Sequence, residues 1–146
     1  MGTRSGIICS KDGFGCTVIE GGEVSDHDIR VPKNLKNRGE QLQWIADEAQ
    51  RLAGAYDFDA VAIQKAAGGG KFGPSPERSE IEAAVQMGLF KAKGLSTNRL
   101  TKEGVRAALK VVKAPGAYET LLERDDVKPR KNEACRHQYL LALAAE

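Results

Sequence analysis

The N-terminal segment alternates short extended stretches with glycine-containing reversals, and this pattern constrains the fold more than any other feature. Two apolar stretches within residues 4–20 flank Asp12-Gly13, a dipeptide typical of type I′ hairpin turns. A two-residue loop there predicts that Cys9 lies opposite Cys16 on the next strand. A pair of glycines then marks a second reversal, and the polar stretch 24–31 is expected to be an edge strand. The chain therefore opens with a predicted three-stranded antiparallel meander.

The spacing of apolar residues changes to a helical period after this meander. Apolar residues recur every three or four positions from Leu42 to Ala53, which predicts a helix that ends at Gly54. Residues 59–64 form a short apolar run that fits a buried strand parallel to the first. Further along we expect a helix capped by Ser75 with Pro76 in its first turn, a strand within 95–100, a helix from Thr101 with Val105, Ala108, Leu109 and Val112 facing inward, and a last helix from about Asn132.

Length and composition favour one domain over residues 1–146. A chain of 146 residues with 41% hydrophobic residues can build a core without disulfides or metals. Strands in hairpins followed by strand–helix alternation predict an α/β fold, a mixed sheet with helices on both faces. No apolar run approaches the roughly 18 residues of a membrane span, and no secretory signal is recognisable, so a cytoplasmic location is expected. The three cysteines and two histidines lack zinc-site spacing.

Four short segments carry a resemblance to a known superfamily. They are Gly6-Ile7-Ile8, Val61–Gln64 followed by Gly70-Lys71-Phe72, Glu82–Gln86, and Asn132-Glu133-Ala134. With the element order, they make the chain similar to the ribonuclease H-like superfamily, and within it to small bacterial proteins distantly similar to Holliday-junction resolvases. The resemblance implies a five-stranded mixed sheet. For active members it also implies carboxylates on the first strand, at the end of the fourth and on the last helix, which together hold two divalent ions.

The positions that correspond to these carboxylates carry mostly other residue types. Ile8 stands on the first strand, Gln64 at the end of the fourth, and Glu133 on the last helix, with His137 one turn later. Two-metal chemistry requires hard oxygen ligands. We therefore interpret Gln64, Glu133 and His137 as the degenerate remnant of a catalytic site. No cofactor is expected, and Glu133 is the ligand if a metal binds.

A series of basic residues is the main positive indication of function. Lysines and arginines recur every three or four positions opposite the apolar stripe of the helix expected from Thr101. The predicted nucleic-acid contacts are Arg99, Lys102, Arg106, Lys110, Lys113 and, in the glycine-rich loop 66–74, Lys71. Such a ridge can follow phosphates, but it is also typical of a solvated helix face. The loop lacks the spacing of a P-loop.

Two aromatic residues are candidate partner contacts. Trp44 lies away from the apolar stripe of its helix, and Phe72 lies in the glycine-rich loop. Burial of Trp44 under a neighbouring segment is the alternative. The sequence thus favours a catalytically degenerate ribonuclease H-like protein that binds nucleic acid or a protein partner. The alternatives are a divergent Mg²⁺- or Mn²⁺-dependent nuclease or junction resolvase that uses Glu133 and His137, and a homo-oligomeric assembly subunit.

Overall fold

The computed structural model describes residues 2–65 and 75–145 and has the predicted α/β architecture. The elements are β1 (Arg4–Cys9), β2 (Gly13–Glu20), β3 (Glu23–Arg30), α1 (Arg38–Tyr56), β4 (Ala60–Gln64), α2 (Pro76–Lys93), β5 (Asn98–Leu100), α3 (Lys102–Ala108), α4 (Ala117–Leu121) and α5 (Glu133–Ala144). The strand order is β3-β2-β1-β4-β5. The first three strands are antiparallel, and β4 runs parallel to both β1 and β5.

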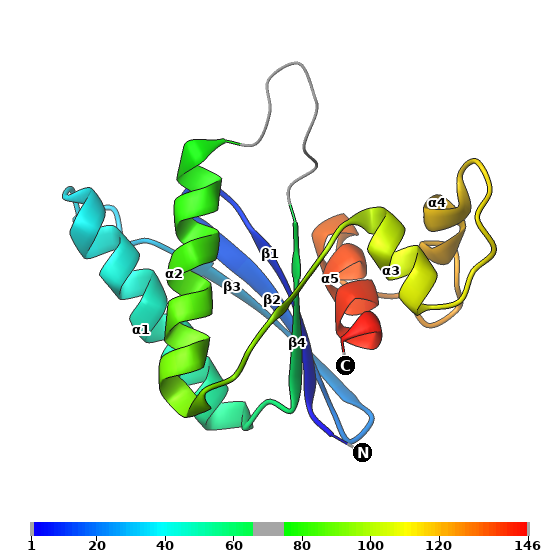
Figure 1. Ribbon diagram of the computed structural model, residues 1–146, viewed down its shortest axis with the longest axis horizontal. Coiled ribbons are helices and arrows are strands. Elements are labelled where there is room, and N and C mark those ends of the chain that lie inside the picture. The colour runs from blue at the N-terminus through cyan, green and yellow to red at the C-terminus, as the bar shows by residue number, and fades with distance from the viewer. Residues whose placement is uncertain (1, 66–74, 146) are drawn as a thin grey trace.

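Helices cover both faces of this sheet. Figure 1 shows α1 and α2 on one face, and α5 with α3 and α4 on the other. Apolar residues of β1 and β2 alternate between the two sides, so Ile7 and Cys16 join the core under α1 and α2, whereas Ile19 joins the core under α5. Within the described residues, no helix is long and apolar enough to cross a membrane.

The first hairpin differs from the prediction in its register. Cys9 lies opposite Phe14, and Ile7, not Cys9, lies opposite Cys16. The shift is two positions, so the side chains keep their predicted faces, and both cysteines are buried in the same core. The predicted Cys9–Cys16 pair is therefore wrong, whereas the prediction that both are core residues is confirmed.

Glycine at position 13 serves a close contact between strands and not a turn. Gly13 is not among the residues with positive φ, and a Cβ atom built there would lie 2.0 Å from the carbonyl oxygen of Ile29. The type I′ geometry occurs at the second reversal, where Gly21 and Gly22 have φ angles of 55° and 89°. The predicted reversal is present but lies one residue earlier, at Lys11-Asp12, where the Ser10 N–H group donates to the Gly13 carbonyl oxygen at 2.9 Å.

The predicted starts of the helices agree with the structure better than the predicted ends. The side chains of Ser75, Thr101 and Asn132 all accept hydrogen bonds from backbone N–H groups as N-caps. Helix α1, however, runs past Gly54 to Tyr56, and its C-cap is Asp57, which adopts a φ of 50°. Helix α3 ends at Ala108, so Val112 is 84% exposed, in contrast to its predicted inward position.

Helix α5 packs unusually close to the centre of the sheet. A Cβ atom at Gly6 on β1 would lie 2.1 Å from the carbonyl oxygen of Gln138, and one at Gly15 on β2 would lie 2.0 Å from the Gln138 side chain. Glycine at these two positions allows the helix to approach the strands. This contact places the first turn of α5 beside the carboxyl end of β1.

Candidate functional site

The residues that the resemblance singled out lie together around one cavity of about 310 Å³. Ile8 comes from β1, Gln64 from the end of β4, and Glu133 and His137 from the first turns of α5. Strands β1 and β4 are parallel neighbours, so their carboxyl ends meet at the same edge of the sheet. Lys102, at the start of α3, lines the same cavity. We refer to this cavity as the cleft.

His137 is held by hydrogen bonding on one side and faces a carboxylate on the other. The Tyr118 hydroxyl lies 2.7 Å from Nδ1 of His137, and Nε2 of His137 lies 3.7 Å from Oε1 of Glu133. Burial, and then the charge of Glu119, raises the pKa of Tyr118 to about 12. The phenol therefore keeps its proton. It donates to Nδ1 when the hydrogen of neutral His137 is on Nε2, and accepts from Nδ1 in the other tautomer.

Lys102 brings a positive charge into this cleft. Its Nζ lies 5.6 Å from the centre of the Tyr118 ring, a cation–π distance. Burial, followed by the charge of Lys102, lowers the pKa of His137 below its usual value. The imidazole is therefore neutral at pH 7, and the ammonium group is the cation of the cleft.

These residues do not match the ligand set of two divalent metal ions. Such ions need several hard anionic oxygens, but the cleft offers one carboxylate, Glu133, one amide, Gln64, and the ammonium group of Lys102, which repels cations. The side chain of Glu133 is 79% exposed. Over residues 2–65 and 75–145, no three His, Cys, Asp or Glu side chains are grouped so as to hold a metal.

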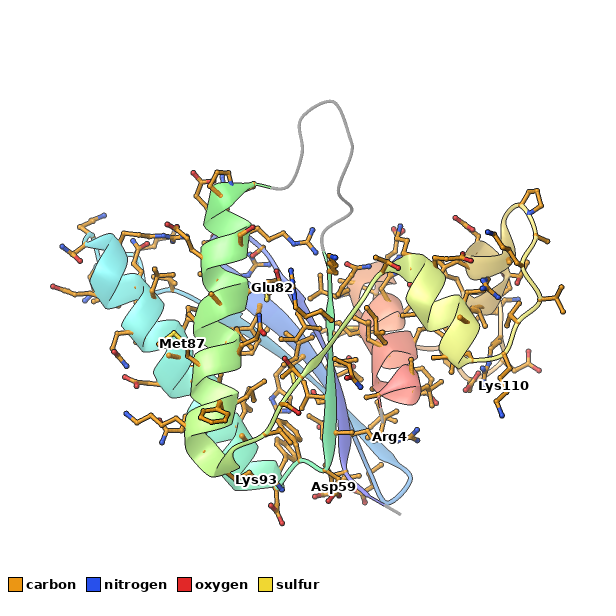
Figure 2. The ribbon with its side chains drawn as sticks, in the orientation of Figure 1. Arg4, Asp59, Glu82, Met87, Lys93 and Lys110 are labelled. Carbon is orange, nitrogen blue, oxygen red and sulfur yellow. The ribbon has the colours of Figure 1, made fainter. Side chains whose placement is uncertain are left out.

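The predicted basic ridge does not form as one surface. Arg99 belongs to β5, and its guanidinium group makes a bidentate ion pair with the buried carboxylate of Glu82, at 2.9 and 3.2 Å. Figure 2 shows Glu82 directed from α2 toward the sheet. Arg99 is therefore engaged on the α2 side of the sheet, away from α3.

The other ridge residues also diverge because α3 is shorter than predicted. The side chain of Arg106 is largely buried and binds Glu103 and the carbonyl oxygen of Val111. Lys110 and Lys113 follow the end of the helix, and Lys110 points away from the sheet in Figure 2. Of the predicted ridge, only Lys102 lines the cleft. Nucleic-acid contact by the others stays a prediction.

The two aromatic residues predicted as partner contacts are Trp44 and Phe72. Trp44 is half-buried and packs against the core under α1 and α2, so it is not the exposed residue that the sequence suggested. Phe72 and Lys71 lie outside the described residues. The partner contact at Trp44 stays a prediction.

The sequence patterns do not indicate that Lys102 lines the cleft or that Tyr118 contacts His137. The spacing of basic residues predicts that Lys102 lies on a helix face, whereas its position as the first residue of α3 places it in the lining of the cleft with Gln64. Tyr118 gave no signal, because α4 has five residues and its packing on α5 depends on tertiary contacts. A single aromatic residue in a helix of five residues has no periodic pattern from which its contact could be predicted.

The comparisons with known proteins support the fold. No protein-family model and no curated protein matches the chain. Thermus thermophilus RuvC in complex with a Holliday junction substrate is similar over 99% of this chain and 92% of its own, with 14% identity and a TM-score of 0.75. The chain has the ribonuclease H-like fold of RuvC. A second T. thermophilus RuvC structure matches 97% of this chain and 92% of its own, at 17% identity and a TM-score of 0.69.

A eukaryotic protein shows the same likeness. The yeast mitochondrial Holliday junction resolvase Ydc2 matches 96% of this chain and 75% of its own, at 10% identity and a TM-score of 0.56. The predicted resemblance to Holliday-junction resolvases is thereby confirmed. At these identities it establishes the fold of the chain.

Proposed function

We propose that this protein is a catalytically degenerate ribonuclease H-like protein that binds nucleic acid. In this proposal the Lys102 ammonium group in the cleft contacts a phosphate where a catalytic relative would place divalent cations. The observation that carries it is the position of Lys102 beside Gln64, Glu133 and His137. A phosphate and a lysine attract each other without any metal, and the contact releases counterions.

The surroundings of the cleft support an anionic ligand. Lys65 directly follows β4, Lys131 directly precedes the α5 cap, and Nη2 of Arg78 lies 3.5 Å from the carbonyl oxygen of Gln64. These three cations therefore gather at the same edge of the sheet as the cleft. Neither Lys65 nor Lys131 has an ion-pair partner among the described residues. Their charges are available to a phosphate backbone.

Binding can be tested by fluorescence anisotropy with a labelled four-way junction and a linear duplex at several salt concentrations. Replacing a lysine that contacts a phosphate weakens binding and reduces the slope of log K against log salt by about 1. Lys102→Gln should have this effect. Lys91→Gln is the matched control, because Lys91 is exposed on α2 and makes no ion pair in the described structure. Equal slopes for wild type and Lys102→Gln would contradict the proposal.

One observation favours the alternative of a metal-dependent nuclease. If Nε2 of His137 bound a metal ion, the Nδ1–H group would point at the Tyr118 oxygen, 2.7 Å away, which is the kind of outer hydrogen bond that orients histidine ligands. Glu133 would be the second ligand, since it faces Nε2. Paramagnetic Mn²⁺ would then selectively broaden the NMR signals of His137, an effect that Glu133→Ala would weaken. The proposal of a binding protein predicts no selective broadening.

A further inference from the structure

A second cavity, of about 330 Å³, adjoins the cleft. The two cavities share Ile8 and Ala134 in their linings. Its volume falls within the range of about 300–1,000 Å³ that is typical of small-molecule sites. The walls include Gly15 from β2, Asp26 from β3 and Gln138 from α5. The cleft therefore has a second, separately lined space directly beside it.

The wall of this cavity contains the amide group of a largely buried glutamine, and this amide has spare hydrogen-bonding capacity. Gln138 is only 5% exposed. The hydroxyl of Thr17 lies 3.0 Å from Oε1 of Gln138 and 2.6 Å from Oδ1 of Asp26, so it lies between the two side chains. Within residues 2–65 and 75–145 no group accepts a hydrogen bond from Nε2 of Gln138, and this nitrogen is not among the fully enclosed atoms that lack a partner, so it is open to the cavity. An amide N–H group that is open to the cavity can donate a hydrogen bond to a polar ligand.

The charges of the lining favour a neutral ligand. Two carboxylates, Asp26 and Asp28, are balanced by two cations, Arg30 and Lys131. Arg30 is in turn bound to Asp28 at 3.1 Å. The carboxylates disfavour an anion. The side chains that the structure describes here also lack the grouping that a metal ion needs. A neutral molecule that both donates and accepts hydrogen bonds suits this lining best.

We propose that the second cavity binds an unpaired guanine base of the nucleic acid held in the cleft. The Watson–Crick edge of guanine presents two adjacent donor groups and one carbonyl oxygen. A carboxylate accepts from such donors, as Asp26 would, and the amide Nε2 of Gln138 would donate to the carbonyl. Ile8 and Ala134 line both cavities, so a base attached to a phosphate in the cleft lies next to the second cavity. This inference rests on the proposed function.

The first test uses DNA duplexes that carry either a single bulged guanine or an abasic bulge at the same place. An unpaired base avoids the cost of disrupting a base pair. The guanine bulge should bind about tenfold more tightly in fluorescence anisotropy, since one recognised base contributes about this much. Asp26→Asn should abolish the difference and leave the affinity for the abasic duplex unchanged. Asp47→Asn, on the exposed face of α1, is the matched control and should retain the difference.

The second test separates this inference from the proposed function. Guanosine monophosphate, but not adenosine monophosphate, should shift the backbone amide NMR signals of Gly15 and Cys135, and Asp26→Asn should remove the shifts. If the nucleotide shifts these signals but no DNA binds, the guanine site stands and the proposed function falls. Equal affinity for the two bulged duplexes, together with unshifted signals, would overturn the guanine site and leave DNA binding intact.

Discussion

The close packing of α5 on the sheet makes a quantitative prediction for Gly6→Ala. The added Cβ atom would lie 2.1 Å from the carbonyl oxygen of Gln138 and 2.6 Å from the backbone nitrogen of Ala142, where ordinary contact begins at 3.4 Å. Both neighbours are backbone atoms, so no side-chain rotation relieves the overlap. Helix α5 must move by about 1 Å, and overpacking of this kind costs about 3 kcal/mol, the upper end of the usual range.

Urea or thermal denaturation followed by circular dichroism measures this cost. For a domain of this size, the loss corresponds to a fall in Tm of about 10 °C. Gly54→Ala is the control, because no atom lies within 4 Å of the added Cβ and the site is inside α1. It should stabilise the protein by about 0.5–1 kcal/mol. A Gly6→Ala protein within about 0.5 kcal/mol of the wild type would refute the described position of α5.

The remaining predictions concern charge and packing. Arg99→Ala leaves the buried carboxylate of Glu82 unpaired and should lower the free energy of unfolding by about 2 kcal/mol in urea denaturation. The loss is smaller than for a fully buried pair because Arg99 is half-exposed. An unchanged midpoint would contradict the ion pair. Because folding lowers the pKa of His137, stability should fall as the pH drops below about 6.5. Lys102→Gln should raise the His137 pKa in an NMR titration and leave that of His27 unchanged; equal shifts at both would place Lys102 outside the cleft. Trp44→Ala should lower the stability by about 3 kcal/mol, and an unchanged mass in light scattering would remove Trp44 as a dimer contact.

The sequence predicts the fold of this chain well because its patterns are local. The apolar stripe of α1, the buried run of β4 and the caps of α2, α3 and α5 all depend on neighbours within a few residues. The predictions are wrong where the local structure depends on contacts with segments that are distant in the sequence. The sequence indicates that Gly13 is a turn residue, whereas the structure shows that it allows close contact with the carbonyl oxygen of Ile29 on another strand. The end of α3 is likewise not marked by any strong stop signal before Ala114-Pro115.

The candidate site is predicted only in part, and for a related reason. The resemblance supplied Ile8, Gln64, Glu133 and His137, and the structure places them around one cavity. Lys102 is predicted as one cation of a helix face, and the structure adds that it lines the cleft, because its direction depends on where α3 begins relative to β4. Charge patterns along a helix show which residues share a face. They do not show whether an arginine on that face, such as Arg106, is bound to backbone carbonyls.

In the proposed function the cleft holds nucleic acid by a cation and not through divalent metal ions that cut it. This can be measured by incubating an end-labelled four-way junction with saturating wild-type protein and Mn²⁺ and separating the bound complex and any cleaved strands on native and denaturing gels. We expect a bound and intact junction, with binding weakened by Lys102→Gln. Cleaved strands that disappear with Glu133→Ala would contradict it and establish a metal-dependent nuclease.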